Sequence, residues 1–176
     1  MLKSLEFAGI QNITLSLGHA AFTSSVLEPF KKLGREIFVD LEIALSKKSQ
    51  SDLDKIIPDS YKNKQSLISL CDMYGEIDII QSAKESFSYL ESTQNFMDHL
   101  EGLAGKLIKN SGITLHVDLG EVQGFKYHNG VVFSAYADSA GYVLAKGGRY
   151  DGLRKQSDRD RPAVGFDLDL VSVSNL

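Results

Sequence analysis

Two kinds of apolar and polar patterning divide the chain into strand-like ends and a helical middle. Residues 13–17 read I-T-L-S-L, and this strict alternation predicts a half-buried strand that Gly18-His19 is expected to break. Beyond residue 20 the apolar positions recur every three or four residues, which is typical of helices that bury one face. The helices expected in this middle cover residues 20–33, 35–47, 49–57, 61–74, 77–90 and 96–108.

Several residues mark where these helices begin and end. Residues 2–9 resemble the last turns of a helix that Gly9 ends. Pro29 is expected to kink or interrupt the helix over residues 20–33, because its ring removes one backbone donor. Gly34 and Gly75 are expected helix ends, and Ser49 or Ser51 is the expected cap of the short helix that Pro58 follows.

A β-rich section begins after residue 112. Its expected strands cover residues 113–119, 131–136 and 142–145. Residues 137–141 form a connector of hairpin length, and the last strand runs into Gly147-Gly148, where a missing Cβ lets a ligand or another backbone come close. Asn129-Gly130 fits either a second tight turn or a bulge inside one long strand.

This order of elements predicts the fold class. A strand, five or six helices, further strands and a final amphipathic segment from Val164 to Val173 suit an α+β protein. We expect an antiparallel sheet with the helices gathered on one side of it. The 176 residues are enough for one domain with a sizeable core, and no internal repeat or flexible linker divides them.

Composition and charge narrow the class of protein. Hydrophobic residues at 43% and charged residues at 24% are ordinary values for a globular protein. A net charge of −4 and a pI near 5.5 speak against nucleic-acid binding through bulk electrostatics. No apolar run reaches membrane-spanning length, and the single cysteine, Cys71, allows no internal disulfide. We therefore expect a cytoplasmic protein.

Two motifs in the β-rich section carry a family resemblance. G-F-K-Y-H-N-G-V-V-F at residues 124–133, followed by G-G-R-Y-D-G-L at residues 147–153, resembles the histidine-recognition part of class II histidyl-tRNA synthetases. Within that superfamily the chain is most similar to the regulatory subunit of ATP phosphoribosyltransferase. The details that favour this subfamily are Tyr127-His128, the run Leu15–His19 and the run Arg161–Phe166.

The resemblance implies an architecture. It implies a partial class II aminoacyl-tRNA synthetase-like domain over residues 1–176, with a helical segment at 25–110 and histidine-site strands and a terminal helix at 113–176. The family's motifs 1 and 2 are not visible in this sequence, so we expect the second half of such a domain. Missing sheet partners would leave strand edges open, and we therefore expect self-association into a homo-oligomer.

The resemblance also implies a histidine pocket. Phenol and imidazole groups can pair with the two distinct nitrogens of an imidazole ligand, and glycines would leave room for its backbone. Taken singly, each residue also fits an ordinary role in a sheet, and Arg149 also fits an ion pair with Asp151. The residues that fall at the family's histidine-site positions are Gln123, Tyr127, His128, Gly147, Gly148, Arg149 and Tyr150.

Departures from the synthetase pattern argue against catalysis. Gln123 stands where the synthetases have an arginine that stabilises the reacting phosphate, and losing one such contact costs about 3–4 kcal/mol in an enzyme. In the motif 3 region, Ser172 stands at the second arginine's position and Asp169 replaces a glycine. We therefore expect no catalytic residues and no cofactor. His19, His99 and His116 show no metal-ligand spacing with one another, so we expect no metal ligands and interpret these three as structural.

The resulting functional hypothesis is a non-catalytic regulatory subunit. It would associate with the short-form catalytic subunit of ATP phosphoribosyltransferase, support the first step of histidine biosynthesis and respond to histidine as a ligand, with no tRNA or membrane partner. Two alternatives remain open at this point. The chain also fits a fragment of a divergent histidyl-tRNA synthetase, or a stand-alone histidine-sensing paralogue.

Overall fold

A mixed β-sheet forms one end of the protein. The computed structural model describes residues 1–109, 113–122, 128–138, 140–151 and 161–176. Within these residues the sheet has six strands in the order β2-β3-β1-β4-β5-β6. The strands are β1 (Ile13–His19), β2 (Tyr74–Gly75), β3 (Ile113–Asp118), β4 (Val131–Ala137), β5 (Ala140–Tyr150) and β6 (Ala163–Leu168).

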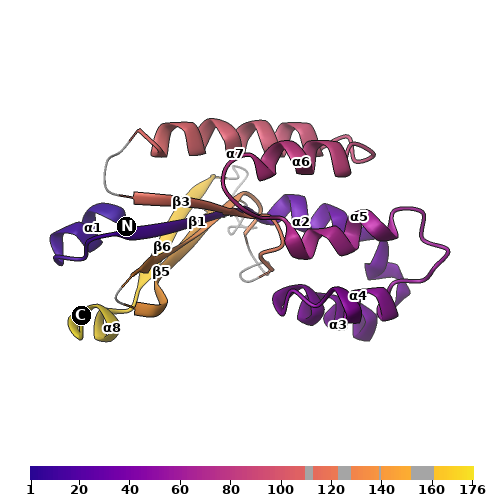
Figure 1. Cartoon of the computed structure of the whole chain (residues 1–176), viewed down its shortest axis with the longest axis horizontal. Coiled ribbons are helices and arrows are strands. Elements are labelled where there is room, and N and C mark those ends of the chain that lie inside the picture. Colours follow the sequence, from indigo (N-terminus) through magenta and orange to yellow (C-terminus); the bar gives the residue numbers. More distant parts are fainter. Residues whose placement is uncertain (110–112, 123–127, 139, 152–160) are drawn as a thin grey trace.

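Most of the helices follow one another between β1 and β3. They are α2 (Ala20–Leu27), α3 (Arg35–Ser46), α4 (Gln50–Ile56), α5 (Lys64–Ser69), α6 (Ile79–Ser86) and α7 (Thr93–Leu107), with 3-10 turns at Glu28–Leu33 and Leu70–Asp72. Two short helices, α1 (Leu2–Phe7) and α8 (Leu170–Ser174), lie near the chain ends. Figure 1 shows α2 to α5 at the end of the molecule opposite α1 and α8, with α6 and α7 along one side.

The helices of the middle segment, and the residues that end or cap them, confirm much of the predicted order of elements. Pro29 ends α2 as a regular helix, and the chain continues as a 3-10 turn. Gly34 then takes a φ of +123°, which residues other than glycine rarely adopt, and α3 follows. The Ser49 hydroxyl accepts a hydrogen bond from the Asp52 N–H and so caps α4.

The sheet is not purely antiparallel, so that expectation was wrong. β1 pairs in parallel with β3, from Ile13 opposite Ile113 to Leu17 opposite Val117, and in antiparallel with β4. The whole helical middle is therefore one crossover connection between two neighbouring parallel strands. Alternation along β1 reveals a strand with one buried face, but it contains no information on the direction of its neighbours.

Two strands continue through glycines at which they were expected to end. β1 runs on through Gly18 to His19, where the strand passes directly into α2. β5 likewise passes through Gly147 and Gly148 and reaches Tyr150. At both places a neighbouring strand supplies hydrogen-bond partners across the glycine, so pairing overrides the weak strand preference of glycine.

Two segments combine a helix with a strand where the pattern predicted one continuous element. The expected helix over residues 61–74 contains only α5 and a 3-10 turn, and Tyr74 and Gly75 form β2 against β3. The final amphipathic segment is β6 followed by α8, divided at Asp169. Asp169 accepts a hydrogen bond from the Ser172 N–H and thereby begins α8.

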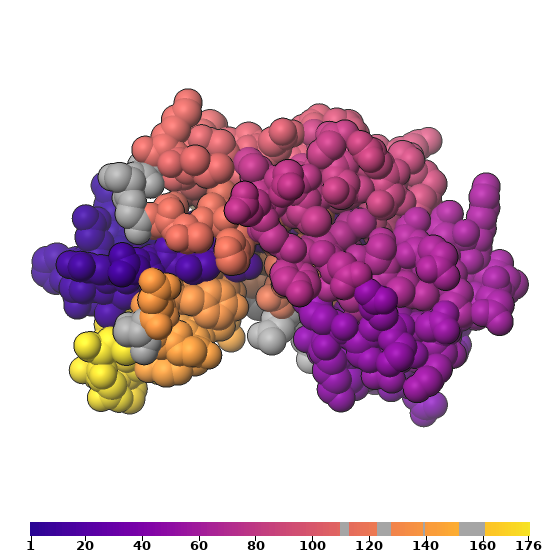
Figure 2. Space-filling model, viewed as in Figure 1, coloured from indigo at the N-terminus to yellow at the C-terminus, as the bar shows by residue number. Residues whose placement is uncertain are grey.

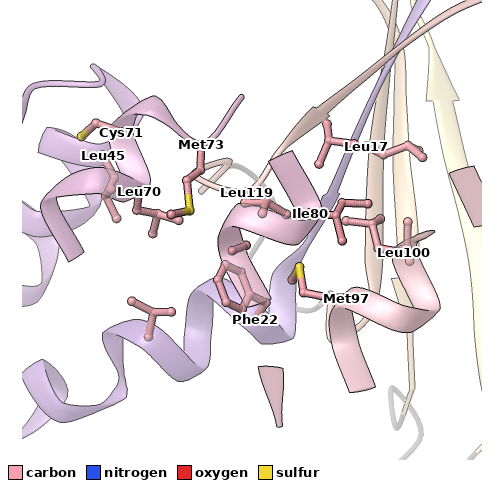
Figure 3. Packing of buried hydrophobic residues seen from close by; sticks show 14 of the residues in the cluster. Leu17, Phe22, Leu45, Leu70, Cys71, Met73, Ile80, Met97, Leu100 and Leu119 are labelled. Carbon is pink, nitrogen blue, oxygen red and sulfur yellow. The ribbon is translucent and has the colours of Figure 1, made fainter. Parts of the chain in front are cut away.

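The core runs from one face of the sheet into the space between the helices. Figure 3 shows Phe22 of α2, Ile80 of α6 and Met97 of α7 gathered near Leu17 and Leu119, all of them buried. Burial of each such side chain stabilises the fold by about 1.5–3 kcal/mol. Cys71 is also fully buried, as expected.

Figure 2 shows a hollow in the surface between strands β4 and β5, in orange, and helices α3 and α4, in purple. In the part of the chain that the structure describes, every helix is too short or too polar to cross a membrane.

Candidate functional site

A cavity of about 510 Å³ opens on the face of the sheet that points away from α7. Side chains alternate between the two faces of a strand, so Leu15 and Leu17 of β1 lie toward α7 while Ser16 and Gly18 lie toward the cavity. One polar row crosses the cavity floor at matching register on four strands. It consists of Ser16, Ser134, Lys146 and Asp167.

A second row, next to the polar one, is made almost entirely of glycine. It consists of Gly18, Val132, Gly148 and Gly165. A Cβ on Gly18 would lie 3.5 Å from the Glu121 side chain, and one on Gly148 would lie 2.7 Å from the His128 ring. A Cβ on Gly165 would lie 3.5 Å from the Tyr150 ring. Gly148 therefore makes room for the His128 ring, whereas a Cβ on Gly18 or Gly165 would be in ordinary contact with Glu121 or Tyr150. The close neighbour of a Cβ on Gly18 would be the Asp118 carbonyl oxygen, at 2.7 Å.

His128 is held in place by its sequence neighbour. The Asn129 N–H donates to the Arg149 carbonyl at 3.1 Å, and the Asn129 side chain accepts from the Asp151 N–H at 3.0 Å. Gly130 bends the chain before β4, and its carbonyl accepts from the Ala20 N–H at 2.9 Å. These bonds bring the His128 ring to 6.3 Å from the Tyr150 ring, centroid to centroid.

Glu121 reaches the cavity from a loop that an ion pair supports. The Asp118 carboxylate accepts from the Gly120 N–H at 2.9 Å and from the Lys48 ammonium at 2.6 Å. Lys48 directly follows α3 and has a φ of +53°. Because its ammonium binds Asp118, the helical part of the chain helps to hold this loop in place. Burial, with smaller effects of Glu121 and Asp118, raises the pKa of the Tyr136 phenol, which also lines the cavity.

The charges around the cavity are mixed, with acids in excess among the described lining residues. Glu121 and Asp167 are acidic, Lys146 is basic, and no arginine is among the described residues that line the cavity. A nucleotide triphosphate needs concentrated positive charge from side chains, metal ions or oriented N–H groups. A zwitterion such as a free amino acid, with one ammonium and one carboxylate, complements this arrangement better.

The structure brings some of the expected pocket residues together and separates others. Gly147, His128 and Tyr150 line the cavity, and Gly148 lies directly beneath the His128 ring. The nearest neighbours of a Cβ on Gly147 would be the Gly165 carbonyl and the Phe133 ring, so this glycine permits close packing of β6. Gln123 and Tyr127 lie outside the described residues.

Arg149 lies away from this cavity. Its side chain points to the other face of the sheet, where it lines an apolar groove beside α7 and forms an ion pair with Asp151 at 3.3 Å. Ser172 belongs to α8 and does not line the cavity, and its N–H and hydroxyl both donate to Asp169. These hydrogen bonds lower the pKa of the Asp169 carboxyl, the backbone N–H contributing most.

Six polar lining residues were not anticipated from the sequence. They are Ser16, Glu121, Ser134, Tyr136, Lys146 and Asp167. All but Glu121 lie on strands of the sheet, so the period-2 rule would have selected them once each strand and its cavity-facing side were placed. Glu121 lies in a loop, and only the three-dimensional contact with Gly18 reveals it.

The same described residues offer no metal centre, because no three histidine, cysteine or acidic side chains among them come together. The cavity is thus a concave site on an α+β sheet with a few charged and polar groups among apolar ones, suited to a small charged ligand.

Solved structures with this arrangement define the class of fold. A protein from Bacillus halodurans C, described as an ATP phosphoribosyltransferase regulatory subunit/histidyl-tRNA synthetase, has a TM-score of 0.81 at 23% identity over 99% of this chain and 47% of its own. Histidyl-tRNA synthetase from Nostoc sp. PCC 7120 has a TM-score of 0.72 at 18% identity over 99% of this chain and 44% of its own. The fold is therefore histidyl-tRNA synthetase-like.

The ATP phosphoribosyl transferase (HisG:HisZ) complex of Thermotoga maritima contains a similar chain. Its TM-score is 0.62 at 15% identity, over 90% of this chain and 53% of that one. The family model described as Histidyl-tRNA synthetase matches residues 1–173. The chain belongs to the histidyl-tRNA synthetase family.

Curated relatives confirm the resemblance to one branch of that family. Proteins named ATP phosphoribosyltransferase regulatory subunit from Cupriavidus metallidurans and Polynucleobacter asymbioticus are 32% and 33% identical to this chain over its full length. A protein of the same name from Nitrosospira multiformis is 33% identical. The chain spans 45–46% of the length of these relatives.

Proposed function

We propose that the chain is part of a non-catalytic regulatory subunit that works with a separate catalytic subunit of ATP phosphoribosyltransferase in the cytoplasm. The observation that carries this proposal is the 32–33% identity, over the whole chain, to proteins that bear the name of that subunit. The likeness to a chain in the HisG:HisZ complex supports a partnership with the catalytic subunit.

Histidine is the proposed ligand of the cavity. Its imidazole has one donor and one acceptor nitrogen when neutral, which can pair with the His128 ring and the Tyr150 hydroxyl. The Lys146 ammonium is suited to the ligand's carboxylate, and the Glu121 carboxylate is suited to its ammonium group. Binding that favours one arrangement of the complex would then make the transferase respond to the end product of its pathway.

Catalysis as a synthetase is the less favoured reading. Activation of an amino acid requires positive charge around the phosphates, and the described lining holds Lys146 against two carboxylates. Ser172, at the position of the family's motif 3 arginine, is taken up in capping α8. These features support a site that binds an amino acid without activating it.

Titration calorimetry with histidine tests the ligand. We expect histidine to bind, and we expect His128→Ala and Tyr150→Phe each to weaken binding about tenfold, which corresponds to loss of one hydrogen bond of about 1.4 kcal/mol. Tyr142→Phe is the matched control, because Tyr142 is an exposed tyrosine of the same strand that does not line the cavity. Unchanged affinity in both site variants would remove the assignment of this pocket.

Two further measurements separate the regulatory role from its alternatives. Co-purification with the short catalytic subunit, together with a gain in transferase activity, is expected of a regulatory subunit. Histidine-dependent exchange of pyrophosphate into ATP is expected of a synthetase instead. A protein that binds histidine but shows neither property would be a stand-alone sensor.

A further inference from the structure

Glu121, the carboxylate suited to the ligand's ammonium group, lies on a loop just beyond the end of β3. β3 ends at Asp118, and residues 118–121, here called the Glu121 loop, lead from the sheet to the cavity. Gly18 of β1 lets this loop approach, because a Cβ there would lie 2.7 Å from the Asp118 carbonyl oxygen. A loop has no strand ladder of its own, so the position of the carboxylate depends on contacts with neighbouring segments.

Two hydrogen bonds tie the middle of the Glu121 loop to the helical part of the chain. The Leu119 N–H donates to the Met73 carbonyl at 2.9 Å, and Met73 directly follows the 3-10 turn at Leu70–Asp72. The Leu119 carbonyl accepts from the Thr23 hydroxyl of α2 at 3.0 Å, and the Leu119 side chain is fully buried. Figure 3 shows Leu119 among the core side chains, near Met73. The loop is therefore anchored to helical elements as well as to the sheet.

Lys48 binds the same loop through its charge. The Lys48 ammonium donates to the Asp118 carboxylate at 2.6 Å, and the Gly120 N–H donates to the same Asp118 oxygen at 2.9 Å. A Cβ on Gly120 would lie 2.7 Å from both the Lys48 ammonium and the Leu70 carbonyl oxygen, so the loop backbone fills the space between them. Lys48 thus fixes the residue that directly precedes Glu121.

We propose that Lys48 and Asp118 are positioning residues for recognition of the ligand's α-ammonium group, an inference that rests on the proposed histidine site. Lys48 holds Asp118, and Asp118 holds the Gly120 N–H. The Glu121 carboxylate therefore stands in place before the ligand arrives, and less ordering has to accompany binding. The helical part of the chain thus helps the cavity to distinguish an amino acid from an imidazole compound without the ammonium group.

The direct electrostatic effect of Lys48 on such a ligand has the opposite sign. Lys48 is a cation beside the loop that carries Glu121, and it repels the ammonium group of the ligand. Removal of this charge would by itself strengthen histidine binding. Loss of positioning weakens it instead, so the sign of the change in affinity separates the two effects.

Titration calorimetry with two ligands tests the proposal. Histidine and 3-(imidazol-4-yl)propionate share the ring and the carboxylate, and only histidine has the ammonium group. We expect Lys48→Met to weaken histidine binding by about threefold to tenfold and to leave the binding of the propionate unchanged. Lys31→Met, which removes an exposed ion pair with Glu28, is the matched control and should change neither affinity.

A double-mutant cycle shows whether Lys48 acts through Glu121. Glu121→Gln keeps the size of the side chain and removes its charge, so it should weaken histidine binding about tenfold without weakening that of the propionate. In the Glu121→Gln background, Lys48→Met should have no further effect on histidine binding.

The positioning role would be overturned by equal weakening of both ligands in Lys48→Met, or by an equal effect of Lys48→Met with and without the Glu121 carboxylate. Full histidine affinity in Lys48→Met would overturn this role and leave the histidine site standing. A wild-type chain that does not bind histidine would overturn both.

Discussion

His19 is a buried imidazole that the fold keeps neutral. Its Nδ1 accepts a hydrogen bond from the Phe22 N–H at the start of α2, and its ring lies 4.7 Å from the Phe96 ring. Burial, with smaller effects of the nearby His99 and Arg149, lowers the pKa of His19 from 6.5 to about 4. A protonated ring could not accept the Phe22 N–H, so the neutral form is part of the structure.

Stability should therefore fall as the pH falls through the range between these two pKa values. Below pH 6.5 the unfolded chain takes up a proton at His19 that the folded chain does not, and the loss between pH 7.5 and 5 amounts to about 2 kcal/mol. Urea unfolding of the wild type and of His19→Asn at both pH values measures it, and the variant should show the smaller loss.

His116→Asn is the matched control for this prediction. His116 is exposed on β3, and its replacement should leave the difference between the two pH values as it is in the wild type. Equal losses in the wild type and in His19→Asn would show that His19 does not cause the pH dependence.

At the scale of single residues, the motifs predicted which residues lie close together better than which face of the sheet they occupy. The two motifs pointed to His128 and Tyr150, which do lie together at one cavity. They also pointed to Arg149, because a motif gives the spacing of residues and not the face of the sheet. Arg149 lies between Gly148 and Tyr150 in β5. Because side chains alternate between the two faces of a strand, Arg149 points to the face opposite to the cavity.

At the scale of elements, Gly147 lies too close to the β6 backbone and to the Phe133 ring to carry a side chain. Gly147 faces Phe166 in the register, and a Cβ on Gly147 would lie 2.8 Å from the Phe133 ring and even closer to the Gly165 carbonyl. Neither neighbour can move without displacing β6 or a half-buried aromatic ring. Gly147 is therefore required for the position of β6.

Gly147→Ala should destabilise the protein by about 2–3 kcal/mol, the cost of overpacking a well-packed site. Gly141→Ala is the matched control in the same strand, since its added Cβ would meet nothing within 4 Å. We expect this control to be neutral or slightly stabilising. Thermal or chemical unfolding of both variants gives the comparison, and similar stability for the two would contradict the close packing of β5 and β6.

Elements with strong local signals were predictable, and elements defined by their partners were not. The helices from α2 to α7 follow from apolar spacing and from residues such as Pro29 and Gly34. β2 is two residues long and exists because Tyr74 and Gly75 pair with β3. The parallel pairing of β1 with β3 is equally a property of two distant segments, which no local pattern encodes.

At the scale of the whole molecule, an ion pair between described residues joins the helical end to the sheet. Lys48, just after α3, contacts Asp118 at the end of β3 at 2.6 Å, and their side chains are 29% and 22% exposed. Asp118 in turn holds the Gly120 N–H in the loop that leads to Glu121. The relative placement of helices and cavity thus depends on a contact between residues 70 positions apart.

Lys48→Met should lower the free energy of unfolding by about 1–2 kcal/mol, because the Asp118 carboxylate keeps its partly buried place without a cation. Lys31→Met, which removes a more exposed ion pair with Glu28, should change it by less than about 0.5 kcal/mol. Denaturant titrations of the two variants measure the difference, and an equal effect would mean that Lys48 is no more than a surface charge.

The position of β1 at the centre of the sheet has a consequence for how the protein is made. Both neighbours of β1 come from residues beyond 112, so this apolar strand leaves the ribosome long before either of them exists. At about 5–20 residues per second, roughly 5–20 s of translation separate β1 from β3. Among the described residues, α1 and the helices that emerge after β1 are the elements that can cover its apolar face during that interval.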